Sequence, residues 1–180
     1  MNNILLSPLA KGVIVDGAYY QVNSGFKTWL EFGRILKSDE NNKAEKILIL
    51  CYKNKIPDRF DKAFGALCDF YTMGEKSTES NGDIKAVFDF EKDSALIYAA
   101  FLHEYGIDLA EENIHWWKFL SLLQSVSKDS RFMEIVGYRC VNPADIKDKN
   151  RRNFYRKMKR LFSIDENRDT DIASTIESLF

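Results

Sequence analysis

The chain has 180 residues, of which 45% are hydrophobic and 13% aromatic, and this composition favours a folded core over a disordered chain. Its formal net charge of −1 argues against a global attraction to nucleic acid or to anionic lipid. No apolar run approaches the roughly 18 residues that a membrane-spanning helix needs, so we expect no such helix.

The amino-terminal stretch and the cysteines favour a cytosolic protein. The first residues lack a basic segment before their short apolar piece and include Pro8, so we expect no secretory signal peptide. Cys51, Cys68 and Cys140 are odd in number and far apart, a pattern typical of free thiols in a reducing compartment. We therefore expect a protein of the cytoplasm.

The first predicted element is a short β-hairpin. The stretch Val13–Val22 has β-branched and alternating residues on both sides of Asp16-Gly17. That pair tolerates the positive φ angles of a tight hairpin turn. Residues 1–23 therefore form an N-terminal strand and hairpin.

Helices are predicted for the rest of the first half. We expect them within residues 24–73, at about 24–37, 43–54 and 58–73. Asn23 or Ser24 can cap the first helix. Pro57 suits the first turn of the third helix, and Gly74 suits its end. The polar segment that follows has no apolar residue from 75 to 83, so residues 74–87 are predicted to be a mobile loop.

The core helices are predicted over residues 88–162. Asp93 or Ser94 caps a helix that Gly106 ends, a tryptophan-rich helix follows at about 110–126, and Asn142-Pro143 opens a last helix to about Phe162. An acidic C-terminal segment, 163–180, completes the chain. The predicted fold is all-α, a compact multi-helix single domain over residues 1–180 with a short N-terminal β-hairpin.

Two adjacent tryptophans, Trp116 and Trp117, stand in the stretch NIHWWKFLSLLQSV. Neighbours on a helix point about 100° apart, so one narrow buried stripe cannot hold both rings. A helical wheel places Trp116 in the buried stripe and Trp117 just outside it. The favoured interpretation is that Trp117 packs under a neighbouring helix or the hairpin, with its N–H on a carbonyl. The alternative is an anchor for a partner protein.

The last helix has a basic face opposite an apolar one. The basic residues are Lys149, Arg152, Arg156, Lys159 and Arg160, and the apolar ones are Phe154, Tyr155, Met158, Leu161 and Phe162. Such a face can neutralise phosphates. However, an acidic segment follows it, and we see neither a glycine-hinged helix-turn-helix pair nor a stacking platform. We favour a solvated face or a docking surface for an acidic partner over nucleic-acid binding.

Signals for metal binding and catalysis are weak. Glu112 and His115 have the spacing that di-iron bundles use, but His103 has Ala100 where a second pair would need glutamate. On the wheel His115 lies in the apolar arc, which favours a hydrogen-bonded core histidine. The GEKS stretch at Gly74 lacks the order and glycine spacing of a phosphate loop. We expect no cofactor, no metal and no catalytic residue.

Several blocks of sequence carry a family resemblance. They are Val13–Phe32, Tyr98–Phe101, Tyr105–Leu109, His115-Trp116-Trp117 with Phe119, and Gly137-Tyr138-Arg139. Together they resemble the bacteriophage gene-product-fifteen family, a group of small proteins of tailed phages and of prophages in Gram-positive bacteria. The His-Trp-Trp-Lys-Phe block is the specific signature, and the similarity spans most of the chain.

The resemblance implies a role in phage tail morphogenesis, since genes of this family usually lie among tail genes near the tape-measure gene. It implies no catalytic residue. We expect a non-enzymatic tail-assembly chaperone or tail accessory protein in the cytoplasm of the bacterial host, which binds the tape-measure or major tail protein. Trp117 and the basic face are the candidate contacts. A structural tail component retained in the virion, and a regulatory module that binds nucleic acid through residues 147–160, stay open as alternatives. Self-association stays open too.

Overall fold

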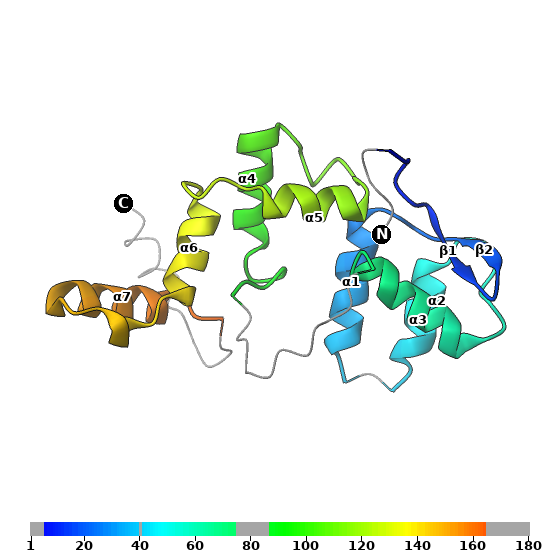
Figure 1. The fold of residues 1–180 in the computed structure, drawn as a ribbon, viewed down its shortest axis with the longest axis horizontal. Helices are drawn as coiled ribbons and strands as arrows, with labels where there is room; N and C mark the ends of the chain where they lie inside the picture. The colour runs from blue at the N-terminus through cyan, green and yellow to red at the C-terminus, as the bar shows by residue number, and fades with distance from the viewer. Residues whose placement is uncertain (1–5, 40, 75–86, 165–180) are drawn as a thin grey trace. The chain divides into compact units, whose positions relative to one another are not determined.

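A computed structural model describes residues 6–39, 41–74 and 87–164 of the chain, and Figure 1 shows its ribbon. The described residues form seven α-helices, a short 3-10 helix and a two-stranded antiparallel sheet. A mostly helical fold with an N-terminal hairpin is therefore confirmed.

These residues fall into two compact units, which we describe one at a time. The first unit holds the described residues up to 74 together with 97–127, and the second holds 87–96 together with 128–164. The prediction of a single domain over the whole chain stays a prediction. Within the described ranges, no helix is both long and apolar enough to cross a membrane.

The predicted hairpin is confirmed. Strand β1 (Gly12–Val15) pairs with β2 (Ala18–Gln21) in antiparallel register. Asp16 and Gly17 form the turn between them, with φ angles of 49° and 80°, and positive values at both positions are what this tight turn requires. Alternate residues of β1 are buried, so one face of the hairpin joins the core of the first unit.

Three helices follow in the first unit, close to their predicted positions. They are α1 (Phe26–Lys37), α2 (Lys43–Cys51) and α3 (Phe60–Tyr71). The buried residues of α1 recur every third position, at Phe26, Trp29, Phe32 and Ile35. The Trp29 ring stacks on Phe70 of α3 with centroids 4.6 Å apart, so α1 and α3 share an aromatic core.

The predicted cap of α1 is wrong. Gly25 is the N-cap residue, and no side chain caps this helix. The Asn23 amide instead donates to the Leu50 carbonyl at 2.8 Å. The Ser24 carbonyl accepts the Trp116 N–H at 2.7 Å. Asn23 and Ser24, which the local sequence pattern predicted as caps, therefore form hydrogen bonds with distant segments instead.

The sequence predicted the end of α3 correctly but not its start. The helix begins after Arg59, so Pro57 lies outside it and is fully buried, and the prediction that placed it in the first turn is wrong. At the other end Gly74 has a φ of 75° and donates its N–H to the Asp69 carbonyl at 2.7 Å. This left-handed glycine ends the helix as predicted. Residues 75–86, most of the predicted loop, lie outside the described residues.

Of the next two helices, the first begins where the sequence predicts and the second begins later. Helix α4 (Ser94–Tyr105) is confirmed where it was predicted, and Gly106 follows it with a φ of 64°. Helix α5 (Trp116–Gln124) is shorter than predicted. It begins late because Gly25 and His115 form an antiparallel bridge just before it, and that pairing holds the chain extended.

The second unit contains α6 (Arg131–Cys140), the 3-10 helix η1 (Pro143–Asp145) and α7 (Lys149–Leu161). The sequence pattern did not single out α6. The prediction that Asn142-Pro143 opens the last helix is wrong, because Asn142 caps η1 by accepting the Ala144 N–H at 3.2 Å. Asp148 caps α7 instead, accepting the Arg151 N–H at 2.7 Å.

Candidate partner-binding surfaces

The tryptophan pair, Trp116 and Trp117, binds the end of a neighbouring helix. The Trp116 indole N–H donates to the Tyr71 carbonyl at 2.9 Å, and the Trp117 indole N–H donates to the Phe70 carbonyl at 2.8 Å. Both carbonyls belong to the last turn of α3, where a helix leaves its own C=O groups without intrahelical partners. The adjacent tryptophans therefore donate to two consecutive carbonyls at the end of α3, and the Phe70 carbonyl also accepts the Met73 N–H at 3.3 Å.

The two rings are buried to different degrees, as the wheel predicted. Trp116 is only 1% exposed and stacks on Tyr71 with centroids 5.2 Å apart. Trp117 is half-buried and lies against Phe70 at 4.9 Å. Its indole N–H donates to a carbonyl of a neighbouring helix, as the favoured interpretation of the sequence predicted. A role for Trp117 in binding a partner stays a prediction.

His115 is held by main-chain groups on both sides of its ring. Its Nδ1 accepts the Trp117 N–H at 3.1 Å, so it is the N-cap of α5. Its Nε2 therefore carries the proton and donates to the Ala10 carbonyl at 2.7 Å. Burial lowers the pKa of His115, although the hydrogen bond to Ala10 opposes this. The predicted hydrogen-bonded histidine is confirmed, but its place on the helical wheel is wrong because the helix starts one residue later.

No metal-binding cluster is found among the described residues, since no three His, Cys, Asp or Glu side chains there are grouped to hold an ion. Glu112, which the sequence paired with His115, is exposed. Its main-chain N–H donates to the Asp108 carbonyl at 2.7 Å in a turn that precedes α5. The pair therefore does not lie on one helix face, which is the arrangement that the spacing argument required.

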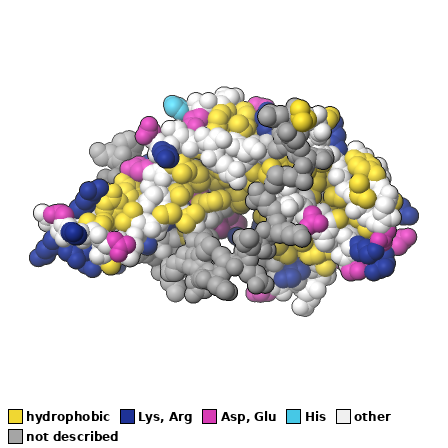
Figure 2. Space-filling view, in the orientation of Figure 1, with side chains coloured by type: hydrophobic (Ala, Val, Ile, Leu, Met, Phe, Trp, Pro, Cys, Tyr) yellow, Lys and Arg dark blue, Asp and Glu magenta, His cyan; other side chains and the backbone are white. Residues whose placement is uncertain are grey.

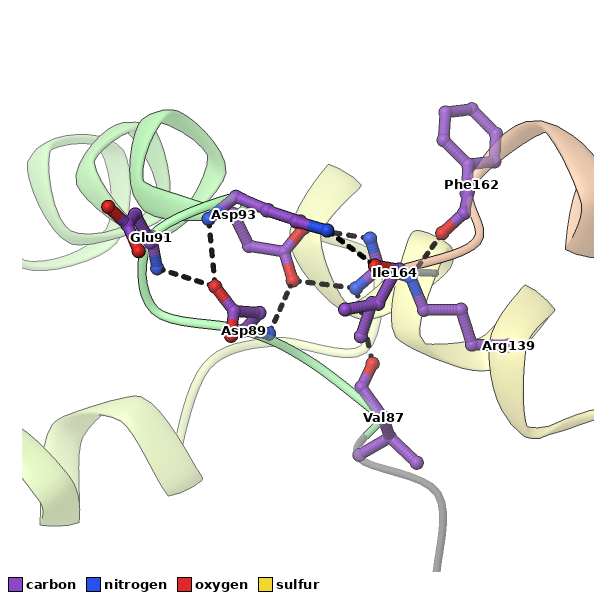
Figure 3. Close-up of polar contacts among 8 residues, drawn as sticks. Val87, Asp89, Glu91, Asp93, Arg139, Phe162 and Ile164 are labelled. Carbon is purple, nitrogen blue, oxygen red and sulfur yellow. Dashed lines mark hydrogen bonds and ion pairs between the residues drawn. The ribbon is translucent and has the colours of Figure 1, made fainter. Parts of the chain in front are cut away.

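A buried ion pair organises the second unit, and the sequence did not predict it. Asp93 is 2% exposed, and its carboxylate accepts both Nη groups of Arg139 at 2.6 and 2.8 Å. It also accepts the Asp89 N–H at 2.9 Å. Asp93 directly precedes α4, and the prediction that Asp93 or Ser94 caps this helix stays a prediction. Figure 3 shows the two charged groups facing each other.

Arg139 also holds the end of α7. Its Nε donates to the Phe162 carbonyl at 2.6 Å, and its Nη1 donates to the Val87 carbonyl at 3.2 Å (Figure 3). Lys92 adds a bond from its Nζ to the Ile164 carbonyl at 2.6 Å. These contacts tie the segment before α4 and the end of α7 to α6. The one sequence signal was the Gly-Tyr-Arg block of the family resemblance.

The basic face of α7 carries the five predicted cations. Lys149, Arg156 and Arg160 are exposed. Arg152 is half-buried and donates to the Lys147 carbonyl at 3.3 Å. Lys159 is also half-buried and donates to the Val141 carbonyl at 2.8 Å. None of the five forms an ion pair with a described residue. Beyond residue 164, the acidic segment that follows lies outside the described residues.

The apolar face of α7 is only partly covered within its unit. No residue of this helix is fully buried. The Tyr138 ring of α6 stacks on Phe162 with centroids 5.9 Å apart and meets Phe154 edge-on at 6.0 Å. Phe154 nevertheless stays 48% exposed. Figure 2 shows Lys and Arg side chains gathered around apolar ones where Figure 1 labels α7.

Comparison with known proteins gives one finding. Residues 5–164 match the family model described as Bacteriophage Gp15 protein. The matched range includes the tryptophan pair, the Asp93–Arg139 ion pair and the whole of α7. No curated protein and no solved structure matches the chain.

Proposed function

The chain belongs to the bacteriophage Gp15 family, and from this premise we propose that it assists phage or prophage tail assembly by binding tail proteins. The tape-measure protein and the major tail protein are the proposed partners. The protein acts in the host cytoplasm as a tail-assembly chaperone or tail accessory protein. The tail-gene setting implied by the family resemblance supports this assignment.

The observation that carries the proposal is the basic face of α7, whose five cations form no ion pair with a described residue, on a helix held firmly at its end. Exposed cations on one face of a helix, with the half-exposed ring of Phe154 on its apolar face, suit the recognition of another protein. The hydrogen bonds from Arg139 and Lys92 to the chain just after α7 fix the position of that helix. A surface held in place before binding loses less conformational entropy when a partner docks.

We also propose that the protein is not an enzyme. His115 uses both of its ring nitrogens in hydrogen bonds to main-chain groups, so it supports the fold rather than acting as a general base. Burial raises the pKa of the Cys51 thiol to about 12, which disfavours the thiolate that a nucleophile requires. Both groups stabilise the first unit.

The decisive experiment measures binding to purified tail proteins of the same phage. We expect the full chain to bind the tape-measure or major tail protein in calorimetry, and to be absent from purified mature particles in mass spectrometry. Presence in mature particles at a fixed copy number would support the alternative of a structural tail component. Failure to bind either tail protein, together with absence from infected-cell tail intermediates, would reject the proposal.

A further inference from the structure

We infer that residues 165–180 of the same chain cover the apolar face of α7, folding back along it as an antiparallel helix. These residues lie outside the described ranges, and the face that they would cover lies within them. Docking there leaves the basic face open to a partner, since Lys149, Arg156 and Arg160 lie on the opposite side of the helix.

The apolar face of α7 is only partly covered by other described residues. Phe154, Met158 and Leu161 fall within a sector of roughly 60°, at about 100° per residue. Phe154 is 48% exposed, and Met158 and Leu161 are half-buried. The neighbouring helix α6 reaches this side with Tyr138, whose ring meets Phe154 edge-on at 6.0 Å. A helix with an apolar stripe but no fully buried residue still has apolar surface to bury.

The sequence of residues 165–180 predicts a helix with a stripe of its own. Ile172, Ile176 and Leu179 recur at i, i+4 and i+7, so on a helix they fall within a sector of roughly 60°. Asp171 directly precedes them and can cap such a helix, and the segment contains neither proline nor glycine. The pattern therefore predicts a short amphipathic helix that needs an apolar surface to pack against.

The spacing of the two stripes sets their register. The stripe of α7 also has the order i, i+4 and i+7. Antiparallel packing places Leu179 opposite Phe154 and Ile172 opposite Leu161, since each stripe spans seven residues, or about 10 Å of helix. The ten residues 162–171 connect the two stripes, and this length is sufficient to reverse the chain between neighbouring helices.

The last described residues lie beside this face. The Phe162 ring stacks on Tyr138 with centroids 5.9 Å apart, and Tyr138 also contacts the apolar face. Arg139 and Lys92 hold the Phe162 and Ile164 carbonyls, each at 2.6 Å. The segment therefore begins close to the surface that it covers, so its effective concentration at that surface is high.

Opposite charges favour the same pairing. Helix α7 contains seven Lys and Arg residues and no Asp or Glu residue. Residues 165–180 contain five Asp and Glu residues and one Arg residue. Attraction between the two orients them, and the apolar stripes then fix their register. A second copy of the chain could offer the same segment, but only the copy's own segment is tethered to its α7.

Hydrogen exchange in the unmodified full-length chain tests the docking. A lone helix of this length is marginal in water, so protection of its amides reports packing against another surface. We expect the amides of residues 175–180 to exchange at least about tenfold more slowly in the full-length chain than in a free peptide of residues 165–180.

Matched substitutions in the segment separate apolar docking from charge. Ile172→Asp with Ile176→Asp places two carboxylates in the apolar stripe and should remove the protection. Ser174→Asp with Ser178→Asp adds the same charge on the other side of the predicted helix and should keep the protection. Phe154→Ala truncates an exposed ring of α7 and should raise the exchange rates of the segment.

Engineered cysteine pairs test the register. All of these variants also have Cys140→Ser, which removes the exposed native thiol. The pair Phe154→Cys with Leu179→Cys should form an intrachain disulfide on mild oxidation, because antiparallel packing brings the two positions together. The control pair Phe154→Cys with Ile172→Cys should not, since its cysteines lie at opposite ends of the packed stripes. Mass spectrometry of proteolytic peptides identifies the bond.

Three results would overturn the inference. Equal exchange rates in the full-length chain and in the free peptide would show that the segment does not dock. Equal disulfide yields from the two cysteine pairs would show that the antiparallel register is wrong. Disulfide-linked dimers in place of the intrachain bond would assign the apolar face to a second copy of the chain.

Discussion

At the scale of single residues, His115 makes the stability of the protein depend on pH. Its Nδ1 accepts a main-chain N–H, so protonation at that atom would place two donors face to face. Burial lowers the pKa of His115 in the folded state below its ordinary value, which is about 6.5. At pH values between the folded and the ordinary pKa, His115 is protonated more often in the unfolded chain than in the folded chain.

The stability that His115 contributes is therefore complete above about pH 6.5 and is lost as the pH falls through the folded pKa. We expect the free energy of unfolding in urea to fall as the pH drops below about 6.5. The variant His115→Asn keeps a capping acceptor without a titrating ring, so it should lose most of this dependence. His103→Asn, at an exposed histidine, is the control and should retain the wild-type slope. Equal slopes in all three proteins would contradict the assignment.

The two tryptophans should respond differently to truncation. Trp116 is almost fully buried, so Trp116→Ala should cost about 3–5 kcal/mol in the free energy of unfolding. Trp117→Ala should also destabilise the fold, because it leaves the Phe70 carbonyl without its indole donor. We expect the affinity of the remaining folded protein for tail proteins to be unchanged by Trp117→Ala. A loss of that affinity with normal stability would make Trp117 a partner anchor.

At the scale of elements, the ion pair between Asp93 and Arg139 joins residues that are 46 positions apart. Removing Arg139 leaves a buried carboxylate without its counter-charge, so Arg139→Ala should destabilise the second unit by about 3–5 kcal/mol. The double variant Asp93→Ala, Arg139→Ala should lose less than the sum of the single variants, because it removes both charges. Arg59→Ala breaks an exposed pair with Asp61 and should change stability little. Additive losses would show that the two charges do not interact.

Elements with local signals were predicted, and elements defined by distant partners were not. The Asp16-Gly17 turn and the glycine at the end of α3 are fixed by their own backbone requirements. The start of α5 depends on Gly25, which pairs with His115 across ninety positions of sequence. In the candidate site, the cations of α7 follow from helical periodicity. The bonds that hold α7 through Arg139 do not, since no local pattern links residues 93, 139 and 162.

At the scale of the whole molecule, the protein has a basic face on α7 but a net charge of only −1, and this combination determines how its attraction to DNA depends on salt. The basic face of α7 should give weak attraction to duplex DNA at low ionic strength. We expect this attraction to disappear at physiological salt, because the chain as a whole has a net charge of −1. Fluorescence anisotropy with a labelled duplex over a series of salt concentrations measures it. Tight binding that survives physiological salt would favour the nucleic-acid alternative.

The placement of the indole rings gives the molecule a built-in optical reporter. All three tryptophans of the chain, Trp29, Trp116 and Trp117, lie in the first unit. Selective excitation of indole fluorescence therefore follows the first unit alone, while far-ultraviolet circular dichroism follows the helices of both units. If the chain unfolds as one cooperative domain, the two signals will give the same denaturation midpoint. If the units melt independently, the curves will separate, and the second unit will unfold without any change in emission.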